Sequence, residues 1–165
     1  MSLTMKAMAK AVAALALVGV SSSAWAGDAW AGQQDSTMAK YAAAIRKIES
    51  TNRYHITANA GRGRTALGAY QVLDTNLDSW SRAALGRSLG QAEFLRSPHL
   101  QDRIFHHRFG QYVRKYGAHG AARAWLGGEG AARGGGGGAD RFGSTPSSYA
   151  SKFMREASSG VGGQG

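Results

Sequence analysis

The sequence predicts a mostly α-helical protein with one folded domain and long loops. Apolar residues recur at helical spacing in several segments, whereas the alternation typical of strands is almost absent. The chain has 165 residues and 24 glycines, many of them gathered between the helical segments. It contains no cysteine, so a disulfide framework is excluded and the domain must be stable through its own apolar core.

The N-terminus has the layout of a secretory signal peptide, which we assign to residues 1–26. Lys6 and Lys10 form a basic start, and an apolar run follows over residues 11–20. The segment ends in Ala-Trp-Ala, a small-x-small cleavage pattern. The apolar run is much shorter than the about 20 residues of a membrane span. We therefore expect cleavage near Ala26 and a periplasmic or secreted protein without a membrane anchor.

The rest of the chain divides into three segments. Residues 27–36 should form a flexible leader, residues 37–157 the folded domain and residues 158–165 a disordered tail. The net charge is +10, and it falls to +8 when residues 1–26 are removed, because they carry two lysines and no acid. Such a charge suits an anionic polymer or surface. The arginines form no block with interleaved aromatics, so nucleic acid is not an expected partner.

The first predicted helix begins near Thr37 and ends near Glu49. Its apolar stripe consists of Met38, Tyr41, Ile45 and Ile48. Residues 51–67 contain glycines without a period and should form an irregular loop. Residues 69–72 are either a short strand or the lead into the next helix.

Four further helices are predicted over residues 73–85, 91–95, 98–116 and 121–126. Gly86 and Gly117 are expected to end the first and third of these. Residues 127–138 are glycine-rich and should be a flexible loop. A last helix begins near residue 145 and carries Tyr149 and Phe153 on one face.

Glu49 is the candidate for acid–base chemistry. It follows Ile48 at the end of the first helix, so it lies at the edge of the buried stripe. The negative end of the helix dipole and partial burial both disfavour its charged form, so we expect a raised pKa. A carboxyl that stays protonated near neutral pH can act as a general acid. The alternative is an ordinary exposed glutamate that pairs with Arg46 or Arg53.

Other site types find little support. His106 and His107 are adjacent and point about 100° apart on a helix, so they cannot form the zinc pair of residues i and i+4. The run GRGRTA over residues 61–66 lacks the preceding strand of a dinucleotide site. No Gly-x-Ser-x-Gly nucleophile elbow is present. We expect no metal and no cofactor.

Four segments carry a family resemblance in a fixed order. They are IES (48–50), ALGAYQV (66–72), AARAWLGG (121–128) and TPSSYASKF (145–153). Together they resemble the soluble lytic transglycosylases (SLT domains) of the lysozyme-like superfamily. The resemblance covers residues 38–155 and implies a single lysozyme-like, SLT-type helical domain.

The resemblance implies a role for Glu49 as the single catalytic acid. It implies that six further residues shape the site or bind the substrate: Ser50, Gly68, Tyr70, Gln71, Trp125 and Tyr149. The tyrosine of the closing helix, Tyr149, is expected near the acid. Trp125 stands where the family usually has tyrosine. Leu126 stands where it usually has asparagine, whose amide can bind the acetamido group of the sugar.

The implied reaction cleaves the β-1,4 bond between N-acetylmuramic acid and N-acetylglucosamine in peptidoglycan. Glu49 would protonate the glycosidic oxygen and then take the proton of the C6 hydroxyl, which closes a 1,6-anhydro ring. No second carboxylate is needed, unlike in most glycosidases. The implied partner is the peptidoglycan glycan strand, and we expect a monomer. The sequence leaves open whether the role is wall turnover, service to an envelope-spanning secretion machine, or lysis.

Three alternatives remain open. The first is a muramidase that adds water, with Asp74, Asp78 or Asp102 as the second carboxylate. The second is a non-catalytic peptidoglycan-binding or assembly protein that kept the fold, which Leu126 favours. The third is a cationic binder of nucleic acid or membrane, which the net charge alone favours.

Overall fold

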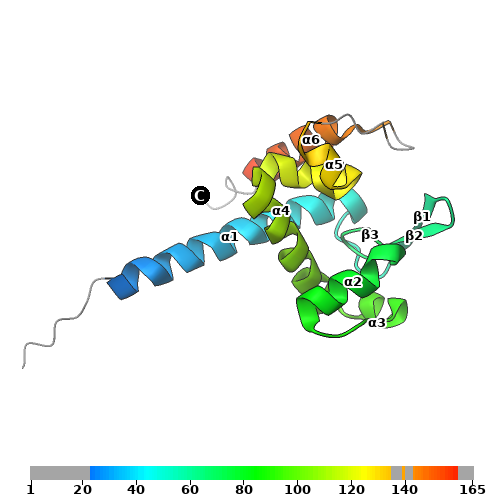
Figure 1. Cartoon of the computed structure of the whole chain (residues 1–165), viewed down its shortest axis with the longest axis horizontal. Helices are drawn as coiled ribbons and strands as arrows, with labels where there is room; N and C mark the ends of the chain where they lie inside the picture. The colour runs from blue at the N-terminus through cyan, green and yellow to red at the C-terminus, as the bar shows by residue number, and fades with distance from the viewer. Residues whose placement is uncertain (1–22, 135–138, 140–142, 160–165) are drawn as a thin grey trace, which may run out of the picture.

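The computed structural model describes residues 23–134, 139 and 143–159, with side chains described from Asp35 onward. Over these residues the chain is mostly helical, with one small three-stranded sheet (Figure 1). The mostly α expectation is therefore confirmed. None of the helices in the part of the chain that the structure describes is long and apolar enough to cross a membrane.

The first helix, α1 (Ser23–Ser50), ends where the sequence predicts but begins much earlier. It runs without interruption through residues 27–36, so the expected flexible leader and the expected start near Thr37 are wrong for this structure. Two alanines and two glutamines in this stretch favour the helix, whereas its two glycines and two aspartates do not. Propagating an existing helix also costs far less than nucleating one. The N-terminal part of α1 projects beyond the other helices (Figure 1).

An antiparallel sheet replaces most of the irregular loop expected over residues 51–67. Its strands, in the order β1-β2-β3, are β1 (Thr57–Gly61), β2 (Arg64–Leu67) and β3 (Val72–Leu73). Arg62 and Gly63 connect β1 to β2 and have φ values of 54° and 69°. Positive φ at both central residues is what a tight hairpin turn of type I′ requires. Residues 69–71 form a turn, and only Val72 of the range 69–72 lies in a strand, so the structure matches neither of the two readings over the whole range.

The remaining helices are α2 (Asp74–Leu85), α3 (Gln91–Arg96), α4 (Pro98–Gly127), α5 (Glu129–Ala132) and α6 (Pro146–Ser159). The predictions over 73–85 and 91–95 are confirmed to within a residue. Gly86 ends α2 in the left-handed conformation, with φ 75°, and its N–H donates to the carbonyl of Arg82 at 2.9 Å. Helix α6 includes the first two residues of the expected tail, and residues 160–165 lie outside the described residues.

The helices predicted over 98–116 and 121–126 are parts of one element, α4. Gly117 interrupts its helical backbone with φ 68° and ψ 172°. The flexible loop expected over 127–138 is wrong in its first part, since α5 occupies Glu129–Ala132. Glu129 contacts Lys115 and Tyr116 of α4, each at 2.7 Å, and these contacts hold α5 against α4. The glycine-rich composition of the segment does not reveal them. Residues 135–138 lie outside the described part of the chain.

An aromatic core joins α1, α4 and α6. Phe109 of α4 lies 6.1 Å from Tyr41 of α1 and 5.5 Å from Phe153 of α6, measured between ring centroids. Ile45 of α1 and Phe153 are fully buried, and burying such side chains stabilises the fold by about 1.5 to 3 kcal/mol each. This packing fixes the last turns of α1 between the two other helices.

Candidate functional site

Glu49 lies in the last turn of α1 and is half-buried. The hydroxyl of Tyr149, in α6, donates a hydrogen bond to Oε1 of Glu49. Tyr149 is buried, with 5% of its surface exposed. Burial raises the pKa of its phenol well above the usual value, and the neighbouring carboxylate raises it further. The phenol therefore stays protonated and remains a hydrogen-bond donor to Glu49.

Ser50 is buried and its contacts are with the backbone. Its hydroxyl donates to the carbonyl of Arg46 at 3.2 Å and accepts the N–H of Arg53 at 3.0 Å. The next two residues, Thr51 and Asn52, have φ values of 55° and 62°, so the chain turns sharply away from the helix axis. Ser50 thus ends α1 and orients the turn after Glu49, and its hydroxyl is occupied by these backbone contacts.

Gly68 and Gln71 form a tight turn between β2 and β3. Gly68 has φ 67°, and a Cβ atom at this position would lie 2.2 Å from Oε1 of Gln101. Gln71 also has positive φ, 51°, and its Nε2 donates to the carbonyl of Gly68 at 2.8 Å. The predicted site residues Gly68 and Gln71 therefore form a turn that is closed by its own hydrogen bond and packs against α4.

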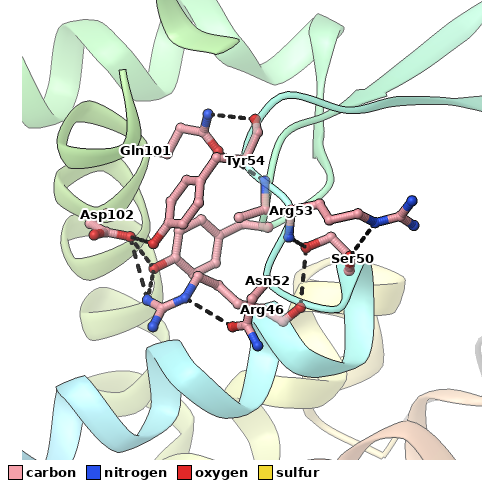
Figure 2. A network of polar contacts seen from close by, with 9 residues as sticks. Arg46, Ser50, Asn52, Arg53, Tyr54, Gln101 and Asp102 are labelled. Carbon is pink, nitrogen blue, oxygen red and sulfur yellow. Dashed lines mark hydrogen bonds and ion pairs between the residues drawn. The ribbon is translucent and has the colours of Figure 1, made fainter. Parts of the chain in front are cut away.

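Gln101 is a residue that the sequence reasoning missed. It is fully buried, and its Oε1 accepts the N–H of Ala69 at 2.9 Å. Its Nε2 donates to the carbonyl of Tyr54 at 3.0 Å (Figure 2). The same Nε2 donates to the carbonyl of Phe94 at 3.0 Å. Gln101 lies three positions before Ile104 and therefore on the apolar face of α4. A polar residue on an apolar helix face was the feature of the sequence that could have identified it.

Tyr70 does not take the place expected of a substrate-binding side chain. It is fully buried, because its ring stacks on Phe105 of α4 with centroids 4.3 Å apart. Its hydroxyl donates to Oδ1 of Asp102 at 2.5 Å. Burial and this hydrogen bond raise the pKa of the phenol. The predicted contact of the Tyr70 side chain with a ligand is therefore corrected to a structural role.

Trp125 is half-buried within an aromatic cluster. Its ring centroid lies 5.1 Å from that of Phe105, 5.4 Å from that of Trp80 and 5.8 Å from that of Phe109. Its indole N–H donates to the carbonyl of Tyr70 at 3.3 Å. Leu126 is also half-buried and packs against the apolar core. The structure thus brings Trp125 to the Gly68–Gln71 turn.

A polar cluster joins the last turns of α1 to α4. The Nη1 of Arg46 donates to the hydroxyl of Tyr70 at 2.8 Å and lies 3.5 Å from Oδ1 of Asp102. The hydroxyl of Tyr54 donates to the same Oδ1 at 2.9 Å. Figure 2 shows Arg46 reaching from α1 towards Asp102 on α4, with Tyr54 beside them. Burial and the hydrogen bond to Asp102 raise the pKa of Tyr54.

The three carboxylates considered as partners of Glu49 have other neighbours. Asp74 accepts the N–H of Thr75 at 2.8 Å at the start of α2. Asp78 pairs with Arg82 on the same helix at 3.1 Å. Asp102 accepts the two tyrosine hydroxyls of the polar cluster.

A hollow of about 380 Å³ lies on the β1–β2 hairpin. It is lined by Thr57, Ala58, Asn59, Gly63, Arg64 and Thr65. None of the residues expected in the site lines it, so the candidate site rests on the contacts of Glu49 and not on this hollow. No group of three or more potential metal ligands occurs among the residues whose placement is described.

Comparison of the chain with protein-family models, curated proteins and solved structures finds no match.

Proposed function

We propose that this chain is an exported peptidoglycan lytic transglycosylase with a lysozyme-like, SLT-type domain. In this proposal Glu49 is the single general acid and base. The observation that carries it is the hydrogen bond from the buried hydroxyl of Tyr149 to the half-buried carboxyl of Glu49. This contact joins the helix-end acid to the closing-helix tyrosine, two features that the family resemblance pairs.

The chemistry follows from the nature of the two groups. A neutral phenol fixes the orientation of a carboxyl without adding a charge, so Glu49 can both give and take a proton. The protonated carboxyl donates its proton to the glycosidic oxygen as the C1–O bond breaks, while the acetamido group of the substrate supports the anomeric carbon. The carboxylate then accepts the proton of the C6 hydroxyl, whose oxygen bonds to C1.

A hydrolytic muramidase is less well supported. It needs a second carboxylate that activates water or attacks the sugar. Asp102 is already bonded to Tyr54 and Tyr70, and Asp78 is paired with Arg82. These contacts favour the mechanism that needs one carboxylate.

The second candidate function is non-catalytic binding of peptidoglycan. The observation in its favour is Leu126, whose apolar side chain packs against the core where the family usually has an asparagine amide. An apolar group cannot replace the hydrogen bond to an acetamido group.

The test compares wild type with Glu49→Gln on insoluble peptidoglycan, with release of soluble fragments as the readout. We expect Glu49→Gln to lose at least about a hundredfold in rate, the usual contribution of a general acid. Glu93→Gln is the control, because Glu93 of α3 pairs with Arg87, which lies between α2 and α3, and with none of the residues of the site. If wild type and Glu49→Gln both bind peptidoglycan and neither releases fragments, the non-catalytic candidate replaces the enzyme.

A further inference from the structure

Arg46 lies three residues before Glu49, on the adjacent turn of α1, and is anchored at both ends. Its carbonyl accepts the hydroxyl of Ser50 at 3.2 Å and the N–H of Asn52 at 3.1 Å. Its guanidinium reaches α4, where it meets Asp102 and Tyr70. A contact that fixes the guanidinium of Arg46 therefore also restrains the turn of α1 that carries Glu49.

Asp102 holds that guanidinium through one carboxylate oxygen. Oδ1 accepts the hydroxyls of Tyr70 and Tyr54 at 2.5 and 2.9 Å and lies 3.5 Å from Nη1 of Arg46. Tyr70 also accepts from Arg46 at 2.8 Å, so Arg46, Tyr70 and Asp102 form a closed triangle of contacts. Hydrogen bonds to a charged acceptor are roughly twice as strong as neutral ones, and a network of them is stiffer than a single pair.

We propose that Asp102 is a positioning residue for Glu49, which it holds in place through Arg46. The α4 side fixes the turn of α1 on which Glu49 lies, and Tyr149 fixes its carboxyl from the α6 side. One hydrogen bond to a rotatable side chain does not fix the orientation of the Glu49 carboxyl, whereas two independent anchors do. This inference rests on the proposed function, since positioning has a kinetic consequence only if Glu49 is the catalytic acid.

The first test measures kcat and KM of Asp102→Asn on solubilised glycan strands. The amide keeps an acceptor for the tyrosines but loses the charge that attracts Arg46. We expect kcat to fall about tenfold or more with KM changed less than about twofold, because a misplaced catalytic group slows the chemical step and not binding. Glu93→Gln is again the matched control, since the Glu93 side chain is 41% exposed and that of Asp102 39% exposed. Equal kcat values for the two variants overturn the proposal.

The second test asks whether Asp102 acts through Arg46. Arg46→Met keeps the apolar stem and removes the guanidinium. If Asp102 works through Arg46, the double variant has a kcat no lower than that of the worse single variant. If the two losses multiply, the residues act separately and the proposal is wrong. Should Asp102→Asn fail to fold, Tyr54→Phe removes one donor to the same oxygen and should give a smaller fall in kcat.

The third test does not depend on activity. The backbone amides of Asn52 and Arg53 bond to Arg46 and Ser50, so their hydrogen exchange reports the order of the last turn. We expect exchange at both amides to rise about tenfold in Asp102→Asn and to stay unchanged in Glu93→Gln. Unchanged exchange in Asp102→Asn contradicts the positioning role. If wild type releases no fragments, the proposed function fails and exchange alone decides whether Asp102 orders this turn.

Discussion

Gly68 occupies a position that no other residue can fill without strain. Its φ of 67° is a left-handed conformation, and a Cβ atom would clash with the amide of Gln101. That amide cannot move away easily, because it is fully buried and its oxygen and nitrogen bond to three backbone groups. The conformation of the turn that carries Gln71 therefore depends on both residues.

Replacing Gly68 by alanine should lower the free energy of unfolding by about 3 kcal/mol or more. The positive φ and the overpacking each cost about 1 to 3 kcal/mol. Gly63→Ala is the control, because Gly63 has a similar φ of 69° and nothing within 4 Å of its Cβ position. It should cost only the backbone share, about 1 to 3 kcal/mol. Urea denaturation measures both, and equal losses would show that the contact with Gln101 does not constrain the turn.

Among the elements, α4 depends on an interruption at Gly117. With φ 68° and ψ 172°, this residue is in a region that only glycine populates readily. The kink separates the part of α4 that carries Asp102 from the part that carries Trp125, so both can reach the Gly68–Gln71 turn.

Gly117→Ala should destabilise the domain by about 2 kcal/mol through the backbone alone, since no atom lies within 4 Å of the added Cβ. Gly130→Ala in α5 is the matched control: its Cβ position is equally open and its φ is not positive. That substitution should be neutral or stabilising by up to about 1 kcal/mol. The unfolding temperatures of the two variants test this expectation. A lower unfolding temperature for Gly130→Ala, together with an unchanged one for Gly117→Ala, would contradict it.

The short helix α5 is held to α4 by the carboxylate of Glu129. A hydrogen bond from Lys115, a second from Tyr116 and the nearby Arg108 lower the pKa of Glu129 from 4.5 to about 2. Because the folded-state pKa is below the unfolded one, these contacts stabilise the fold fully above about pH 4.5. Their contribution is lost as the pH falls through about 2.

Glu129→Gln should therefore be less stable than wild type at about pH 6, and the difference should shrink as the pH falls through that window. Urea midpoints at a series of pH values measure it. Comparing the two proteins at each pH cancels the contributions of the other carboxylates whose pKa is lowered, such as those of Glu93 and Glu156. A difference that stays constant down to about pH 2 would show that the contacts of Glu129 do not favour its charged form.

For the molecule as a whole, features that depend on neighbours along the chain could be predicted, and features that depend on distant contacts could not. The stripe around Ile45 and the stop at Gly86 follow from local periodicity and capping, and both are confirmed. The hairpin was missed because its turn places a non-glycine residue, Arg62, at positive φ between very short strands.

Within the candidate site the same distinction applies. The helix-end position of Glu49 could be read from its own segment, and the resemblance placed Tyr149 near it. The burial of Tyr70 and the contacts of Gln101 and Asp102 could not be predicted, because their partners come from segments far apart in the sequence.

The most direct test of the central claim is mass analysis of the fragments released from peptidoglycan in oxygen-18 water. We predict that wild type releases 1,6-anhydro-muramyl fragments without oxygen-18, because the C6 hydroxyl and not water closes the bond to C1. Glu49→Gln should release almost none. Incorporation of oxygen-18 at the new sugar end would show hydrolysis and a muramidase. Equal release by wild type and Glu49→Gln would contradict the role of Glu49 as the catalytic acid.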